Sequence, residues 1–125
     1  MKTSFIRAFR VQPYGWHLYL FDNAEKWARF VARKTKTTIA ERRGDCEGAA
    51  GITYCDGETR LIYVGVFDGE PGTLAHEMTH AAVRIISDAG MHIDASNDEP
   101  LAYQIGHLID ECIQKILEVH TRKTP

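Results

Sequence analysis

The sequence predicts a single α+β domain in which a small antiparallel or mixed sheet supports a helix that packs against a C-terminal helix. Two pairs of strand-like segments and two long segments with helical periodicity point to this class. The chain has 125 residues, of which 44% are hydrophobic, so it can bury one core but has little room for a second. We therefore expect residues 1–125 to form one domain.

Two strand pairs and a short helix are expected before the long helices. Residues 5–11 and 16–21 are rich in strand formers and flank a turn, and together they predict a hairpin. Asp22 or Asn23 then caps a helix from Ala24 to about Lys34. Residues 48–54 and 60–67 predict a second hairpin, because the Asp-Gly pair at 56–57 favours a tight turn.

The second predicted helix begins near Leu74, because the turn-forming residues 68–73 end in Thr73, a good N-cap residue. Gly90 is a natural residue to end it. Its expected core-facing stripe consists of Leu74, Met78, Ala81, Ala82, Ile85, Ile86 and Ala89.

The last predicted helix is capped by Asn97 or Asp98, has Pro100 in its first turn and runs to about His120. Its apolar residues recur at helical spacing, which indicates that one side of it packs against the core. The expected core-facing residues are Leu101, Ile105, Leu108, Ile109, Cys112, Ile113, Ile116 and Leu117.

Composition limits the partners and the compartment. A formal net charge of −2 and a pI near 6.3 give no overall attraction to nucleic acid or to an anionic membrane. The chain shows neither the apolar region of a signal peptide nor the roughly eighteen apolar residues of a membrane span. We expect a cytoplasmic protein that contacts neither membranes nor nucleic acid. The sequence does not indicate an oligomeric state.

One local basic cluster departs from this charge balance. It consists of Arg29, Arg33, Lys34, Lys36, Arg42 and Arg43. The cluster offers a way to contact nucleic acid. The carboxylates of Glu41, Asp45 and Glu47 lie close by in the sequence, however, and they favour a solvated helix face and loop.

The cysteines indicate a reducing compartment. Cys46, Cys55 and Cys112 form neither a C-x-x-C pair nor an even-numbered framework, so buried free thiols are expected. A bridge between Cys46 and Cys55 across the second hairpin, or a second structural zinc site, is the less favoured alternative.

The second predicted helix carries the residues with the clearest chemistry. Residues 76–80 read His-Glu-Met-Thr-His, an H-E-x-x-H motif. Side chains four residues apart lie on one face of a helix, so His76 and His80 can reach one metal ion while Glu77 projects beside it. Residues of these types are poor choices for packing beside an apolar stripe. The motif therefore indicates a zinc site of the peptidase type, with Glu77 as the general base.

A catalytic zinc ion needs a third protein ligand. The metzincin pattern requires Gly at position 83 and His at position 86, but this chain has Val83 and Ile86 there. Glu99 is favoured, because it begins the last helix and would enter the site from a rigid element. The downstream candidates are His92, Asp94, Asp98, Glu99 and His107.

Further residues follow Glu99 on the same helix face, at Tyr103, Gly106 and Asp110. Ala102 and Gly106 are small, which is expected to let the two long helices approach closely. Tyr103 is the first candidate for a catalytic phenolic donor to the oxyanion of a tetrahedral intermediate. The alternative is that its ring packs locally, as tyrosines on helix faces more often do.

The H-E-x-x-H motif and Glu99, which follows His80 after eighteen residues, resemble the gluzincin arrangement of zinc metallopeptidases. More narrowly, residues 76–82 and 97–106 are similar to small predicted metallopeptidases of tailed phages and prophages. The resemblance implies a minimal zincin-like fold and Zn²⁺ bound by His76, His80 and Glu99. It also implies that Glu77 is the catalytic acid/base in the hydrolysis of a peptide bond of a peptide or protein substrate.

The chain departs from the better-known gluzincins at one position. These proteins often place an Asp four residues after the ligand glutamate to orient a histidine, and this chain has Tyr103 there. Asp110, Asp94 or a backbone carbonyl would have to support the histidines instead.

A peptide substrate is expected to bind in an extended form along a sheet edge. Residues 61–67 form the predicted strand nearest in sequence to the motif helix, although the sequence does not show whether that strand is an edge. The alternative function is a zinc-binding regulatory or interaction module with little turnover. Glu77 argues against this alternative, since a structural zinc site does not require a general base.

Overall fold

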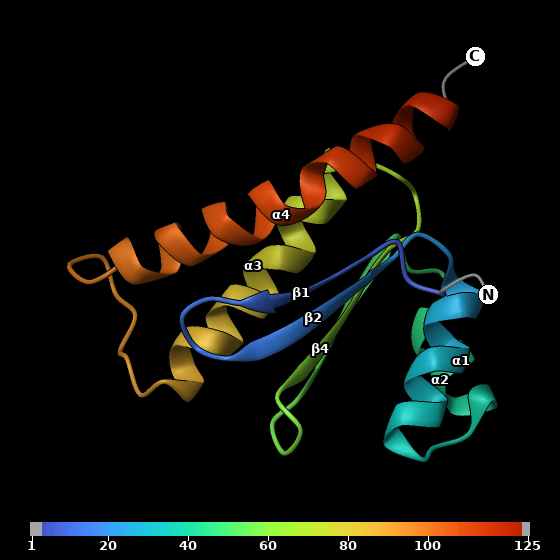
Figure 1. Cartoon of the computed structure of the whole chain (residues 1–125), viewed down its shortest axis with the longest axis horizontal. Helices are drawn as coiled ribbons and strands as arrows, with labels where there is room; N and C mark the ends of the chain where they lie inside the picture. The colour runs from blue at the N-terminus through green and yellow to red at the C-terminus, as the bar shows by residue number, and fades with distance from the viewer. Residues whose placement is uncertain (1–3, 124–125) are drawn as a thin grey trace.

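The structure is a computed structural model that describes residues 4–123. Four strands and four helices make up an α+β fold, as predicted (Figure 1). In chain order they are β1 (Arg7–Val11), β2 (Trp16–Phe21), α1 (Ala24–Thr35), α2 (Ile39–Cys46), β3 (Gly51–Asp56), β4 (Leu61–Val66), α3 (Pro71–Asp88) and α4 (Glu99–Lys123).

The sheet is mixed and has the strand order β1-β2-β4-β3. Both predicted hairpins are confirmed, because β1 pairs with β2 and β3 pairs with β4 in antiparallel fashion. The hairpins join through β2 and β4, which are parallel, with Tyr19 opposite Tyr63. This order places β4 inside the sheet, so the strand that the sequence offered for substrate binding is not an edge. The edges are β1 and β3.

Helix α3 begins earlier than the sequence suggested. Its first residue is Pro71, whose fixed φ and missing N–H suit the first helical position, and Glu70 is the N-cap residue without a side-chain capping bond. The expected start near Leu74 is therefore wrong. Thr73 lies inside the helix, where its hydroxyl donates to Asp68 Oδ2 at 2.7 Å. Gly90 ends the helix region with a φ of +82°, as predicted.

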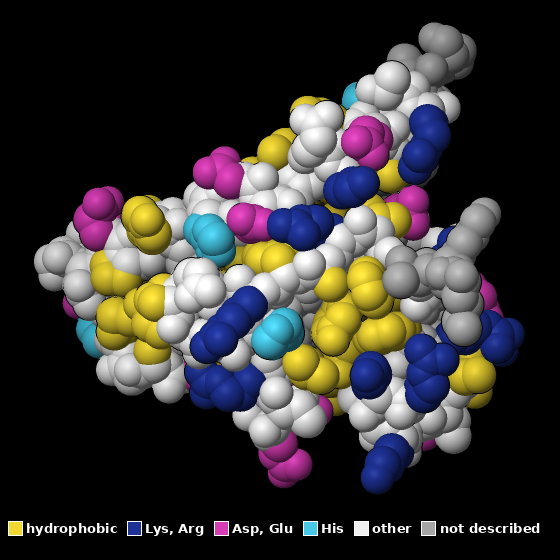
Figure 2. Space-filling model, in the orientation of Figure 1, with side chains coloured by type: hydrophobic (Ala, Val, Ile, Leu, Met, Phe, Trp, Pro, Cys, Tyr) yellow, Lys and Arg dark blue, Asp and Glu magenta, His cyan; other side chains and the backbone are white. Residues whose placement is uncertain are grey.

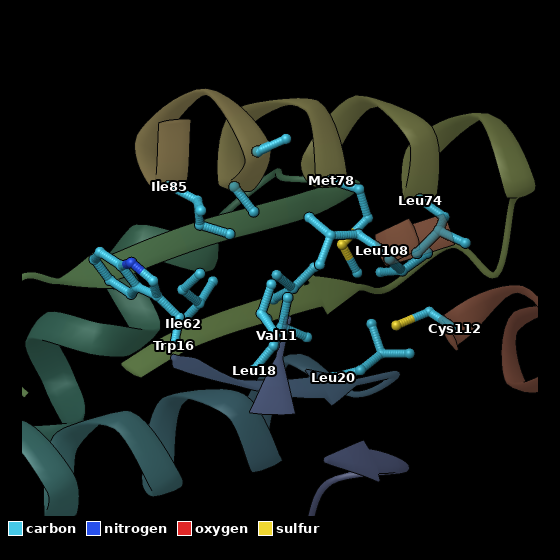
Figure 3. Packing of buried hydrophobic residues seen from close by; sticks show 14 of the residues in the cluster. Val11, Trp16, Leu18, Leu20, Ile62, Leu74, Met78, Ile85, Leu108 and Cys112 are labelled. Carbon is cyan, nitrogen blue, oxygen red and sulfur yellow. The ribbon is translucent and has the colours of Figure 1, made fainter. Parts of the chain in front are cut away.

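One face of the sheet carries α3 and α4, and their facing side chains form the main core. In Figure 3, Leu74 and Met78 of α3 and Leu108 and Cys112 of α4 lie together with apolar side chains of the sheet, such as Val11 and Leu20. The predicted packing of the motif helix against the C-terminal helix is confirmed. The predicted core-facing residues of the two helices need correction: Ala89 and Leu117 are exposed, whereas Gln104 and Val119 of α4 are buried.

The opposite face of the sheet is covered by α1 and α2 (Figure 1). Asn23 caps α1 by accepting a hydrogen bond from the backbone N–H of Lys26 at 3.0 Å, as predicted. The sequence analysis did not predict α2, a helix capped by Thr38. The second core is largely aromatic and comprises Phe21, Trp27, Ala28, Phe30, Val31, Cys46 and Tyr63.

The three cysteines are free thiols, so the alternative bridge between Cys46 and Cys55 is not formed. Cys46 and Cys112 are buried as expected, whereas Cys55 is only partly buried. Among the helices of residues 4–123, none is both long and apolar enough to cross a membrane.

Candidate functional site

Helix α3 places the three motif residues in two different environments. The rings of His76 and His80 lie together on the exposed side of the helix, with centroids 5.0 Å apart and planes at 74°. Glu77 points toward the sheet and is only 7% exposed. The helix therefore offers two imidazoles to solvent and holds a carboxylate beside them in a protected position.

A cavity of about 390 Å³ opens next to these residues, between α3 and the edge strand β3. Its polar side chains come from the motif helix, and its other wall is the start of the edge strand. The lining residues are Ala50, Gly51, Gly72, Thr73, His76 and Glu77. A small extended molecule at this position would contact both the motif and a strand edge.

The hydroxyl of Thr53 on β3 holds the Glu77 side chain. Its Oγ1 atom lies 2.7 Å from Glu77 Oε1 and 3.0 Å from the backbone carbonyl oxygen of Glu77. Both distances fit a hydrogen bond, and the single hydroxyl proton can be donated to one acceptor or shared between the two, with the shorter distance to the carboxylate. The carboxylate of the predicted general base is thus attached to the sheet.

Close packing between β3 and α3 brings the strand to the carboxylate. A Cβ atom added at Gly51 would lie 2.7 Å from Thr73 Cγ2, 2.8 Å from the carbonyl oxygen of Gly65 and 3.0 Å from Glu77 Cγ. Only glycine fits at this position without displacing its neighbours. Gly51 and Thr53 were not predicted as site residues. Their spacing of two places them on one face of a strand, but nothing in the sequence shows which face of β3 meets α3.

The predicted third ligand is not assembled with the two histidines. Glu99 is exposed in the first turn of α4. Among residues 4–123, no three His, Cys, Asp or Glu side chains are close enough together to hold a metal ion. The chemistry of His76 and His80 fits a zinc ion, and these two side chains are the part of the predicted donor set that the fold brings together. Glu99 as a ligand stays a prediction.

Tyr103 also lies away from the motif cavity. Its side chain is 79% exposed and lines a separate hollow of about 280 Å³ with Ala102, Gly106, His107 and Asp110. No atom lies within 4 Å of a Cβ built at Gly106. The expected close approach of α3 and α4 at Gly106 is therefore wrong, and Tyr103 as a catalytic donor stays a prediction.

The other candidate ligands have local partners. His92 Nε2 lies 3.4 Å from Asp94 Oδ2, and Asp94 also accepts hydrogen bonds from Ser96, which lower the pKa of its carboxyl group. The His107 ring contacts Phe9 with a centroid distance of 6.2 Å. These contacts lie in the loop before α4 and between α4 and β1 rather than at the motif.

Three of the six cations in the basic cluster of residues 29–43 are paired with carboxylates. Arg29 and Arg43 both bind Glu25, at 2.7 and 2.6 Å, and Arg42 lies 3.1 Å from Asp45. On the face shown in Figure 2, Lys and Arg side chains are dispersed among other residues and do not form one patch. The contacts agree with a solvated face, which the sequence analysis favoured over a nucleic-acid contact.

Comparison of the chain with protein-family models, with curated proteins and with solved structures gives no match.

Proposed function

We propose that this protein is a zinc-dependent peptidase of the cytoplasm, which hydrolyses a peptide bond in a peptide or protein substrate. One observation carries the proposal: His76 and the protected carboxylate of Glu77 line a cavity next to a sheet edge, and the exposed ring of His80 lies against that of His76. A helix that served only for packing would gain nothing from this arrangement.

The proposed roles divide between the two environments. His76 and His80 would hold the zinc ion, which supplies a Lewis acid and makes water acidic enough to lose a proton near neutral pH. Glu77 would accept that proton and pass it to the leaving amine. Its protected position favours the transfer, because few competing water molecules reach the carboxylate.

Glu99 remains the third ligand of the proposal. In this role it requires the first turn of α4 to approach the exposed face of α3. Tyr103 would then come nearer to the motif as well, because it lies one turn further along the same helix face. The Glu99 assignment is tested by the metal content of variants.

The edge strand supports a peptide as the substrate. The cavity is lined by Ala50 and by Gly51 of β3, and β3 pairs on one side only, with β4. An extended peptide can add to such an edge through backbone hydrogen bonds. The substrate strand of the proposal is thus β3, in place of the strand at residues 61–67.

The test combines metal analysis with cleavage. Wild-type protein is expected to bind one equivalent of zinc, measured by mass spectrometry, and to cleave a mixed peptide library. His76→Ala and Glu99→Ala should lose zinc, whereas Glu77→Gln should keep zinc and lose cleavage. Undiminished zinc in Glu99→Ala would exclude that ligand, and cleavage by Glu77→Gln at the wild-type rate would contradict the peptidase proposal.

The alternative is a zinc-binding regulatory or interaction module with little or no turnover. It is favoured by the incomplete donor set, because only two of the predicted ligands lie together within the described residues. In that case zinc should bind through His76 and His80, no peptide of the library should be cleaved, and Glu77→Gln should behave as the wild type does.

A further inference from the structure

The edge strand β3 approaches the Glu77 side chain at two places, at its methylene carbon Cγ and at its carboxylate. Gly51 and Thr53 are two residues apart and therefore lie on the same face of the strand. Gly51 leaves room for the stem, since a Cβ there would be 3.0 Å from Glu77 Cγ. Thr53 reaches the tip through the 2.7 Å contact between its hydroxyl and Oε1.

We propose that Thr53 is a positioning residue, which fixes the orientation of the Glu77 carboxylate for proton transfer. The inference rests on the proposed function, because it assigns a role in the same reaction. It adds a residue that no motif contains and that lies more than twenty positions earlier in the chain.

The geometry of the hydroxyl favours this role over simple packing. Thr53 Oγ1 also lies 3.0 Å from the carbonyl oxygen of Glu77, so the strand is attached to the helix at the very residue whose side chain it orients. Any small movement of β3 would therefore carry the carboxylate and its own backbone together. A base held in this way keeps one rotamer, which proton transfer requires.

The hydrogen bond occupies only one of the two carboxylate oxygens. Within residues 4–123, the hydrogen bond that the Glu77 carboxylate accepts is the one from the Thr53 hydroxyl to Oε1. Oε2 is thus the atom left to accept a proton from water. Thr53 itself neither gains nor loses a proton in this scheme, so it acts through Glu77 and does not touch the reacting atoms.

Two substitutions separate orientation from packing. Thr53→Val keeps the branched shape and the strand preference but removes the hydroxyl, whereas Thr53→Ser keeps the hydroxyl and removes a methyl group. Glu77→Gln is the reference for a lost base. All proteins are loaded with zinc, and their zinc content and urea unfolding are measured so that loss of metal or of the fold is recognised.

The kinetic readout uses one peptide that wild-type protein cleaves, selected from the mixed library. Thr53→Val should lower kcat by about 10- to 100-fold, as expected for a displaced catalytic group, with KM and zinc content unchanged. Thr53→Ser should restore most of the rate. In the double variant with Glu77→Gln, Thr53→Val should cause no further loss, because the group that it orients is gone.

A second readout does not depend on activity. In zinc-free protein, the side-chain carboxyl ¹³C resonance of Glu77, assigned by its absence in Glu77→Gln, should move toward that of exposed glutamates in Thr53→Val and stay in Thr53→Ser. A wild-type kcat in Thr53→Val, with Glu77→Gln inactive, would overturn the inference alone. If wild-type protein cleaves no peptide, the proposed function fails and the inference fails with it.

Discussion

Gly51 of β3 and Glu77 of α3 lie so close together that no side chain fits between strand and helix. An added Cβ at Gly51 would be 3.0 Å from Glu77 Cγ, and it would also meet Thr73 Cγ2 at 2.7 Å and the Gly65 carbonyl oxygen at 2.8 Å. Contacts with a backbone oxygen cannot be relieved by a change of rotamer. The position of the predicted general base therefore depends on glycine, which has no side chain, at position 51 of the neighbouring strand.

Gly51→Ala should destabilise the protein by about 1–3 kcal/mol, the usual cost of adding a methyl group to a well-packed region. The strand and α3 must move apart to admit the new atom. Urea unfolding followed by circular dichroism measures the loss. An unchanged unfolding midpoint would show that β3 and α3 are further apart than the structure places them.

Gly106→Ala is the matched substitution in α4 and should have the opposite effect. No atom lies within 4 Å of a Cβ built at Gly106, and alanine is favoured over glycine inside a helix by about 1 kcal/mol. The same urea experiment should therefore show a gain of up to about 1 kcal/mol. A loss of stability would mean that α4 approaches another surface at Gly106, as the sequence analysis had supposed.

The elements that were predicted correctly are specified by residues close to them in the sequence. Asn23 caps α1, and Gly90 with its positive φ ends the α3 region. The parallel pairing of β2 with β4 joins residues more than forty positions apart, and no turn or cap encodes it. Because that pairing decides which strand is an edge, the identity of the edge beside the motif could not be predicted.

The same distinction applies to the candidate site. His76, Glu77 and His80 were predicted because helical spacing alone puts them together. Thr53 depends on which face of β3 meets α3, a relationship set by tertiary packing. Glu99 was chosen from its place in sequence, and the structure leaves it exposed in the first turn of α4, because the crossing of the two helices is set by apolar residues such as Leu108.

Glu25 should make stability depend on pH in the acid range. Arg43 and Arg29 hydrogen-bond its carboxylate and lower its pKa from 4.5 to about 2. The stabilisation is present above pH 4.5, the ordinary pKa of the unfolded chain, and is lost as the pH falls from about 4.5 to about 2. The difference in urea midpoint between wild type and Glu25→Gln should therefore shrink from pH 6 to pH 2.5.

A matched control for that measurement is Glu58→Gln, which changes an exposed carboxylate at the tip of the second hairpin. Its effect should be small at both pH values. Because the Glu25 pairs are exposed, 1 M NaCl should also reduce the Glu25→Gln difference. A difference that grows on acidification would contradict the ion pairing between α1 and α2.

The thiol of Cys112 should resist modification until the core opens. The side chain is 0% exposed, and burial raises the pKa of its thiol to about 12, so the reactive thiolate is scarce at neutral pH. With iodoacetamide at pH 8, mass spectrometry should show an unlabelled Cys112 in native protein and three labelled cysteines in urea. Cys55, which is partly buried and has a pKa raised to about 11, should be labelled slowly without denaturant. Since Cys112 packs between α4 and the sheet, rapid native labelling would show that α4 separates readily from the core.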